Sequence, residues 1–343
     1  MKKYNVAILG ATGAVGQEFI SLIEERKFPF SGLKLLASSR SAGKILKVAG
    51  KDYVVEEATV DSFSGVEIAL FAGGSASKEF APAAVKAGAV VIDNSSTFRM
   101  DPTVPLVVPE VNPEAARNHQ GIIANPNCST IIMVMALKPI HDRARIRRVV
   151  VSTYQAVSGA GKEGIDELTE QVRAISEGQS VQAKILPSAS LDKHYQIAFN
   201  LLPQIDVFLE DGYTKEEMKM VHETRKIMNE PELAITATTV RVPVYRSHSE
   251  SINLELEQAL SVEEAKKLLA SFPGVIVQDN PAEMEYPMPL FVSGRNEVFV
   301  GRVRLDDSVK NGLNLWVVGD QIRKGAALNA LQIAELLIAD DLL

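Results

Sequence analysis

The sequence predicts an α/β protein of two domains, a doubly wound parallel sheet followed by an α+β domain. Its length of 343 residues suits two domains of ordinary size. Up to residue 127, short apolar runs alternate with helical stretches, which is typical of a parallel sheet covered by helices on both faces. After residue 127, the strand patterns alternate between apolar and polar residues, as in strands with one exposed face.

The first domain is expected to begin with a strand at 4–9, which a glycine-rich turn connects to a helix over 17–26. That helix is amphipathic, with Phe19 and Leu22 on its inner side. The remaining elements are expected at 33–37, 67–72 and 89–92 for strands and at 76–87 for a helix.

The second domain is expected to mix antiparallel strands with helices. Its strands are predicted at 147–157, 236–243, 252–257 and 298–304, and its helices at 162–177, 214–229 and 262–271. A last helical pattern over 326–343 follows a glycine-bounded segment and is expected to pack on the first domain. We therefore assign residues 1–127, completed by the C-terminal helix 322–343, to the first domain and residues 128–321 to the second.

The composition excludes several classes of partner. A net charge of −7 and the lack of any basic run argue against nucleic acid and anionic membranes. The longest apolar run, 131–137, is far shorter than a membrane span, and the apolar stretch near the N-terminus is too short for a signal peptide. One cysteine cannot form an internal disulfide. We expect a cytoplasmic protein with no membrane or nucleic-acid partner and no metal site.

The glycines of the first turn predict a dinucleotide site. Gly10, Gly13 and Gly16 stand between the first strand and the first helix, so the backbone can approach a pyrophosphate at a helix N-terminus. This spacing predicts a Rossmann-type domain, and the alternative is an ordinary strand-to-helix turn. NAD-dependent chains normally carry an acidic residue after the second strand, whereas this chain has Ser38-Ser39-Arg40-Ser41. Hydroxyls and a guanidinium suit a 2′-phosphate, so NADP is favoured, unless Arg40 is a solvated surface charge.

The only cysteine, Cys128, lies in the polar stretch Asn125-Pro126-Asn127-Cys128-Ser129-Thr130, just ahead of an apolar helical run. Such a stretch marks a helix N-terminus, where unpaired N–H groups and the helix dipole favour a thiolate. A lone cysteine is otherwise more often a small buried hydrophobic residue. The polar setting favours a nucleophile over that alternative.

A thiolate nucleophile needs a partner that handles protons. Of the five histidines, His141 and His222 fall on helical stretches beside charged residues, and His119 and His194 lie in polar connections. His248 follows a strand, at a place where the strand gives way to a loop. The residues alone rank it only slightly above the others.

Two arginines are candidates for binding an anion. Arg99 closes the stretch that follows a strand of the first domain, and Arg241 lies in a later strand, seven residues before His248. An odd separation places two side chains on opposite faces of a regular strand, but Pro243 and the loop interrupt this regularity. Both a buried, anion-binding role and a surface role stay open for these arginines.

The chain resembles the aspartate-β-semialdehyde dehydrogenases along essentially its whole length, and the motifs occur in the order that the family has. The motifs that carry the resemblance are GATGAVG at 10–16, SSRSAGK at 38–44, DNSSTFRM at 93–100, VPEVN at 108–112, NPNCST at 125–130, YQAVSGAG at 154–161, EEMK at 216–219, RVPVYRSHSE at 241–250 and WVVGDQIRKGAA at 316–327. The resemblance implies that 4-phospho-L-aspartate acylates a cysteine and that NADPH reduces the thioester to L-aspartate 4-semialdehyde.

The resemblance also implies roles for individual residues. Cys128 matches the nucleophile, His248 the acid/base, and Gln155 a residue that orients the substrate. Arg241 matches the ligand of the substrate carboxylate, and Arg99 and Lys219 match the phosphate ligands. Asn127, or the backbone N–H of Cys128, is suited to stabilise an oxyanion. The expected cofactor contacts are Gly10, Thr12, Gly13, Ala14, Val15, Ser38, Arg40, Ser41, Ser158, Gly159 and Gln321.

Several points stay open. The acid that contacts the substrate amine is Glu216 or Glu217, and three-residue spacing puts Glu216 and Lys219 on one helix face. The segment 75–80 lacks the cysteine–glutamine pair of one branch of the family, which leaves contacts near Gly73-Gly74 open. A homodimer or homotetramer is implied, with 162–200 as part of the contact. The rivals are an N-acetyl-γ-glutamyl-phosphate reductase and a non-catalytic NADP-binding sensor.

Overall fold

The computed structural model describes residues 2–343, and the chain divides into two compact units. The first unit contains the residues up to Asn127 together with Gly325–Leu343, and the second is Cys128–Lys324. The chain therefore re-enters the first unit at Gly325, whereas the sequence predicted this boundary at residue 322. The segment around this point, Arg323–Ala327, forms a π-helix that runs into the last helix.

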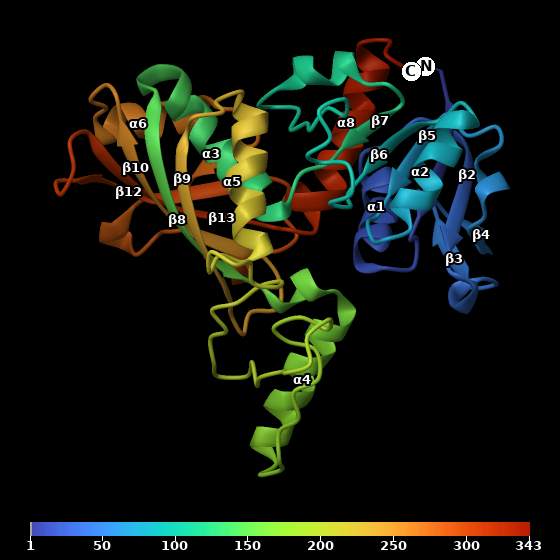
Figure 1. Cartoon of the computed structure of the whole chain (residues 1–343), viewed down its shortest axis with the longest axis horizontal. Helices are drawn as coiled ribbons and strands as arrows, with labels where there is room; N and C mark the ends of the chain where they lie inside the picture. The colour runs from blue at the N-terminus through green and yellow to red at the C-terminus, as the bar shows by residue number, and fades with distance from the viewer. Residues whose placement is uncertain (1) are drawn as a thin grey trace. The chain divides into compact units, whose positions relative to one another are not determined.

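The first unit is built on a seven-stranded sheet with the order β3-β4-β2-β1-β5-β6-β7 (Figure 1). Its strands are β1 (Tyr4–Leu9), β2 (Phe30–Ala37), β3 (Ile45–Val48), β4 (Lys51–Glu57), β5 (Ile68–Phe71), β6 (Val90–Asp93) and β7 (Ile122–Ala124). All pairings are parallel except that of β3 with β4. Three of these strands, β3, β4 and β7, were not predicted; β3 and β4 form a hairpin with mostly polar or exposed residues.

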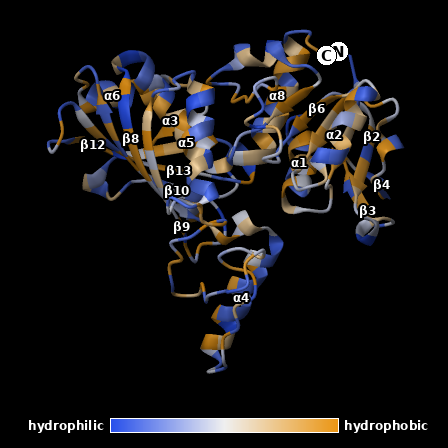
Figure 2. Ribbon diagram, viewed as in Figure 1, coloured by the Kyte–Doolittle hydropathy of each residue, from blue (hydrophilic) through white to orange (hydrophobic). Residues whose placement is uncertain are grey.

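Helices cover both faces of this sheet. Alternate residues of β1 point to opposite sides, so Val6 and Ile8 belong to one apolar core and Ala7 and Leu9 to the other. The first core is closed by α1 (Ala14–Glu25) and α8 (Leu328–Ala339), and the second by α2 (Ser77–Lys86). Helix α8 is hydrophobic along most of its length (Figure 2). Truncating its fully buried Leu331 to alanine would cost about 2–5 kcal/mol of stability.

The second unit contains a mixed six-stranded sheet with the order β11-β12-β13-β10-β8-β9. Its strands are β8 (Ile146–Gln155), β9 (Ala234–Arg241), β10 (His248–Leu256), β11 (Val275–Val277), β12 (Val298–Asp306) and β13 (Gly312–Gly319). The central pairings are antiparallel, and the two outermost pairs, β8 with β9 and β11 with β12, are parallel. The α/β and α+β architecture expected from the sequence is therefore confirmed.

Helix α3 (Cys128–Ala144) packs against this sheet, flanked by α5 (Lys215–Met228) and α6 (Val262–Ser271). Most of α3 is buried, because it lies between the strands and the other two helices. A smaller apolar core around Val157, Leu168 and Leu186 joins α4 (Lys162–Ser176) to the coil that follows it. The predicted helices of this domain are thus confirmed, and α5 and α6 pack beside α3, whose first residue is the cysteine.

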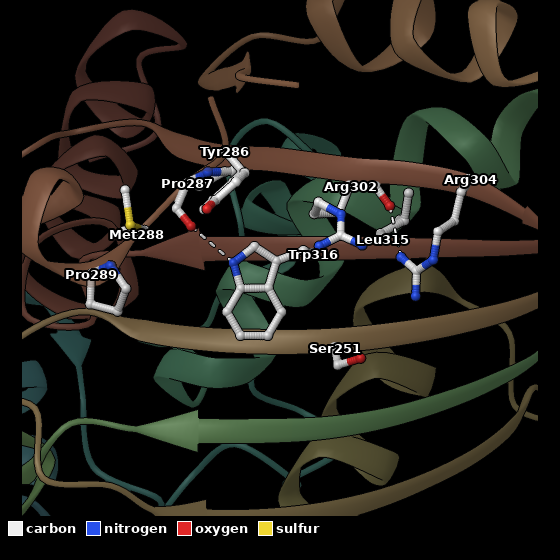
Figure 3. A pocket seen from close by; sticks show the side chains of 9 residues that line it. All are labelled: Ser251, Tyr286, Pro287, Met288, Pro289, Arg302, Arg304, Leu315 and Trp316. Carbon is white, nitrogen blue, oxygen red and sulfur yellow. Dashed lines mark hydrogen bonds between the residues drawn. The ribbon is translucent and has the colours of Figure 1, made fainter. Parts of the chain in front are cut away.

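The opposite face of the second sheet is only partly covered within the chain. Along β10, Ser251 and Asn253 are half-buried, whereas their neighbours Ile252 and Leu254 are buried. A cavity of about 320 Å³ lies on this face. Its wall includes Trp316, Arg302 and Arg304 (Figure 3). Trp316 donates a hydrogen bond from Nε1 to the Pro287 carbonyl over 2.9 Å. The cavity lies on the other side of the sheet from the residues described next.

Candidate active site

Cys128 is the first residue of α3 and is half-buried and not in a disulfide. The first four N–H groups of a helix have no intrahelical acceptor, and the helix dipole is positive at this end. The local sequence explains the position, since Pro126 and Asn127 precede a helix whose next turns, from Ser129 to Leu137, are all buried. The thiol thus lies at the positive end of a fixed helix.

Gln155 connects this helix start to the neighbouring helix. It is the last residue of β8 and is buried, and its Nε2 donates to Ser129 Oγ over 2.6 Å and to Glu216 Oε1 over 3.2 Å. Its side chain is therefore held beside the residue that follows Cys128. Ser129 was not among the predicted site residues. In the sequence, only its position next to Cys128 distinguishes it from other serines.

The structure separates the two glutamates that the sequence left as alternatives. Glu217 forms a capping box with Thr214 at the start of α5, and its Oε1 accepts from the Thr239 N–H over 2.9 Å. Glu216 instead lies against Gln155 and forms an ion pair with Lys219 over 3.1 Å. The predicted placement of Glu216 and Lys219 on one face is confirmed, and Glu216 is the acid that joins the cluster.

Lys219 lies between two carboxylates. Its Nζ is 2.9 Å from Asp206 Oδ2 and 3.1 Å from Glu216 Oε2. Burial opposes the charge, but the two carboxylates together outweigh it, so the pKa of Lys219 is raised. Lys219 is thus a fixed cation. Asp206 was missed by the sequence analysis, because it belongs to an irregular segment with no motif around it.

Arg241 ends β9 and is almost completely buried. Its Nη1 donates to the Ala156 carbonyl over 2.8 Å. Burial lowers its pKa, and the charges of Glu216 and Cys128 act in the opposite direction. Because a guanidinium keeps its proton in proteins, Arg241 supplies a buried positive charge close to both acidic groups.

His248 is the first residue of β10, not part of a loop as predicted, and it is fully buried. The Ala156 N–H donates to its Nδ1 over 3.1 Å. The strand before it ends at Arg241, and Ser247 has a left-handed φ of 73°, so the regular alternation is broken between them. A Cβ on Gly159 would lie 2.6 Å from Arg241 Nη1 and 3.4 Å from His248 Cε1, which brings both side chains to one place.

The other histidines of the second unit differ from His248. His141 Nε2 lies 3.3 Å from Glu230 Oε1 at the far end of α3, His222 is exposed on α5, and His194 is in a half-buried coil. Among residues 2–343, no group of three or more His, Cys, Asp or Glu side chains is arranged to hold a metal ion.

The three further candidates of the second unit, Ser158, Gly159 and Gln321, lie close together. Gln321 donates from Nε2 to Ser158 Oγ, and its Oε1 accepts from the Ser247 N–H over 2.8 Å. The neighbouring Asp320, which the sequence analysis missed, is fully buried and accepts from Arg246 Nε over 2.6 Å. The loop before His248 is therefore fixed by the two side chains that directly follow β13.

The first unit carries the remaining candidates. Gly10 has a φ of 83°, and a Cβ on Gly16 would lie 2.2 Å from the Gly10 carbonyl, so the turn requires glycine at both positions. Helix α1 begins at Ala14 with Val15 after it. Thr12 Oγ1 donates to Ser41 Oγ over 3.3 Å, which links this turn to the segment after β2. These residues leave the helix start open to a pyrophosphate.

The segment after β2 contains Ser38, the short helix Ser39–Ser41 and no acidic residue. Arg40 and Ser38 are exposed. Arg99, in contrast, is buried, and its Nη2 donates to the Asn94 carbonyl over 2.8 Å. The turn before it is held by Asp93, which accepts from Ser77 Oγ over 2.7 Å. Asn127, at the end of the first chain segment of this unit, is also buried.

Two family models match the chain. Residues 5–119 match a model described as a semialdehyde dehydrogenase NAD-binding domain, and residues 137–324 match one described as a semialdehyde dehydrogenase dimerisation domain. Both parts of the chain are thus those of a semialdehyde dehydrogenase, with a nicotinamide-dinucleotide domain in the first unit.

Full-length relatives narrow this class. The chain is 59% identical to the aspartate-semialdehyde dehydrogenase of Aquifex aeolicus, over 99% of each chain, and 53% identical to that of Bacillus subtilis, over 97% of each. A crystal structure of aspartate semialdehyde dehydrogenase II of Vibrio cholerae complexed with ASA matches with a TM-score of 0.94 and 48% identity, over 99% of each chain. The Candida albicans enzyme with NADP matches with a TM-score of 0.75 and 27% identity, over 100% of each chain. The chain belongs to the aspartate-semialdehyde dehydrogenase family, which confirms the resemblance stated from its motifs.

Among residues 2–343, no helix is both long enough and apolar enough to cross a membrane.

Proposed function

We propose that the chain catalyses the reversible, NADPH-dependent reduction of 4-phospho-L-aspartate to L-aspartate 4-semialdehyde and phosphate, as a cytoplasmic enzyme of lysine, threonine, methionine and diaminopimelate biosynthesis. The observation that carries this proposal is the buried cluster around the start of α3. There, Gln155, Glu216 and Arg241 gather near the only cysteine of the chain. An ammonium, a carboxylate and a reactive carbonyl need an acid, an arginine and a nucleophile, respectively.

The roles of the individual residues are those that the family resemblance implies. Cys128 is the nucleophile that becomes acylated, and Gln155 orients the substrate beside it. Arg241 binds the substrate carboxylate and Glu216 the ammonium group, while Arg99 and Lys219 bind the phosphate. His248 is the acid/base of the reaction, and Asn127 or the backbone N–H of Cys128 supports the oxyanion. The first unit, with the C-terminal helix, holds the cofactor, and the second unit carries catalysis and dimerisation.

The test of this function compares two semialdehydes as substrates of the oxidative reaction. We expect phosphate-dependent reduction of NADP with L-aspartate 4-semialdehyde and none with N-acetyl-L-glutamate 5-semialdehyde, whose acylated nitrogen carries no charge for Glu216 to bind. Turnover is measured from the absorbance of NADPH. Preference for the acetylated substrate would indicate the rival reductase, and cofactor binding without any turnover would indicate a sensor.

NADP is the proposed cofactor, bound by Gly10, Thr12, Gly13, Ala14 and Val15 at the pyrophosphate. Ser38, Arg40 and Ser41 take the 2′-phosphate, and Ser158, Gly159 and Gln321 complete the site. The bound cofactor supplies the hydride. An exposed arginine beside two serines, with no acid after β2, supports the choice of NADP over NAD.

Arg40→Ala is expected to raise the KM for NADPH about 10- to 100-fold and to leave the KM for NADH unchanged, because a charge-assisted hydrogen bond to the 2′-phosphate is lost. Steady-state kinetics with both cofactors measure this. Lys47→Ala removes an exposed cation of the same sheet and serves as the control. Equal changes of the KM for NADPH and NADH would show that Arg40 acts only as a surface charge and does not bind the 2′-phosphate.

The proposed assembly is a homodimer or homotetramer, in which 162–200 forms part of the contact. Phe199 is 76% exposed, which is unusual for a large apolar side chain and supports an interface here.

A further inference from the structure

Three asparagine side chains of the first unit form a chain of hydrogen bonds. Asn329 of α8 donates from Nδ2 to Asn125 Oδ1 over 2.7 Å, and Asn125 donates from Nδ2 to Asn94 Oδ1 over 2.8 Å. Asn125 directly follows β7 and Asn94 directly follows β6. Asn329 and Asn125 are fully buried, and Asn94 is half-buried. The chain of amides therefore connects the C-terminal helix to the carboxyl ends of two strands.

Backbone carbonyls fix the direction of this chain at both ends. Asn329 Nδ2 also donates to the Val107 carbonyl over 3.0 Å. At the other end, Asn94 Nδ2 donates to the Phe71 carbonyl over 2.7 Å. Because a carbonyl oxygen can only accept, each terminal amide must turn its NH2 group toward it. The central amide of Asn125 is then held in one orientation, since its oxygen meets a donor and its nitrogen meets an acceptor.

The last asparagine of the chain also holds Arg99. Arg99 Nη2 donates to the backbone carbonyl of Asn94 over 2.8 Å. Asn94 is itself fixed twice on Phe71, because its backbone N–H donates to the same carbonyl as its side chain, over 3.1 Å. A shift of the Asn94 side chain would therefore move the peptide group that accepts from the guanidinium.

The orientation of Arg99 matters because its side chain is buried. Only 8% of the residue is exposed, so protein acceptors rather than solvent set the direction of the guanidinium. A guanidinium binds phosphate through a rigid planar fork, which requires a defined angle between the two groups. A small rotation of the fork would cost one of the two hydrogen bonds to a phosphate.

We propose that Asn329, acting through Asn125 and Asn94, positions the guanidinium of Arg99 for phosphate. This inference rests on the proposed function, in which Arg99 binds the inorganic phosphate and the phosphoryl group of the acyl phosphate. Asn329 is a positioning residue, since it acts on phosphate only through the other two asparagines. The C-terminal helix thus contributes to phosphate recognition, although it supplies none of the proposed phosphate ligands.

Asn329→Ala removes the first donor of the chain and leaves a residue that is well suited to a helix. Asn125 Oδ1 then loses its donor, and its amide is no longer held in one orientation. We expect the KM for phosphate in the oxidative reaction to rise about tenfold, with the KM for the semialdehyde and kcat within about twofold of wild type. Asn329→Asp keeps the shape but turns an acceptor toward two acceptors, and it should raise the KM for phosphate at least as much.

A double-mutant cycle shows whether Asn329 acts through Arg99. Arg99→Ala alone should raise the KM for phosphate about 100-fold, because a charged ligand is lost. Adding Asn329→Ala to Arg99→Ala should change kcat/KM for phosphate by less than about twofold, since no guanidinium is left to position. The same factor for Asn329→Ala in both backgrounds would overturn the proposal, because independent residues have additive effects on the free energy.

Thermal unfolding and a control variant separate positioning from stability. A loss of stability alone lowers the fraction of folded enzyme and with it the apparent kcat, but it leaves both KM values unchanged. Asn118→Ala makes the same change at an exposed asparagine of the first unit and should alter neither KM. A lower Tm with a wild-type KM for phosphate in Asn329→Ala would contradict the proposal. Failure of the proposed function would appear separately, as wild-type enzyme without phosphate-dependent turnover.

Discussion

Replacing Cys128 by alanine is expected to lower phosphate-dependent NADP reduction by at least about 10⁴-fold, because no other group in the cluster can form the thioester. The side chain is half-buried and small, so its loss should leave folding intact. Turnover with L-aspartate 4-semialdehyde is measured for both enzymes at equal concentration.

Cofactor binding provides the control for this variant. The proposed NADP contacts do not include the thiol, so Cys128→Ala should bind NADPH with the wild-type dissociation constant in a fluorescence titration. Cys128→Ser, which keeps the shape but not the thiolate, should be nearly as inactive. Substantial turnover by either variant would exclude the thioester mechanism.

Arg241→Lys is expected to lower kcat/KM for the semialdehyde about 10²-fold. Lysine keeps the charge but lacks the planar fork that binds a carboxylate in two places, and it cannot also reach the Ala156 carbonyl in the same geometry. The KM is measured for each substrate. We expect the KM for the semialdehyde to rise. The KM for phosphate should stay the same, since phosphate is assigned to Arg99 and Lys219.

Arg147→Lys makes the same exchange at a surface position, where the arginine side chain is 62% exposed, and should change neither constant. A rise in the KM for phosphate in Arg241→Lys would instead assign Arg241 to the phosphate. Thermal unfolding of both variants shows whether the loss of activity comes from a loss of stability.

Local periodicity predicted most of the elements that carry the site. Helical spacing placed Glu216 and Lys219 on one face, and their ion pair of 3.1 Å confirms it. The polar stretch before the apolar run predicted a helix start at Cys128, and α3 begins there. Both predictions depend on neighbours within one turn of helix, which is the range that a sequence pattern describes.

Long-range convergence was not predictable in the same way. Arg241 and His248 meet only because the chain turns between β9 and β10, at residues whose backbone conformation no alternation pattern specifies. Ala156 holds both through its backbone groups, so its side chain gave no sign of this contact. Asp206 reaches Lys219 from an irregular segment, where neither a helical nor a strand period exists.

The presence of one cysteine in the whole chain has a practical consequence. A thiol-directed reagent can modify this protein at a single thiol, Cys128 Sγ, so the number of labels per chain equals the fraction of chains whose Cys128 has reacted. Mass spectrometry can therefore count how many Cys128 thiols a bound substrate protects from labelling. In an oligomer, the same count shows whether substrate bound to one subunit protects the thiol of another, and no engineered variant is needed. The thiol proposed as the nucleophile thus serves as its own reporter.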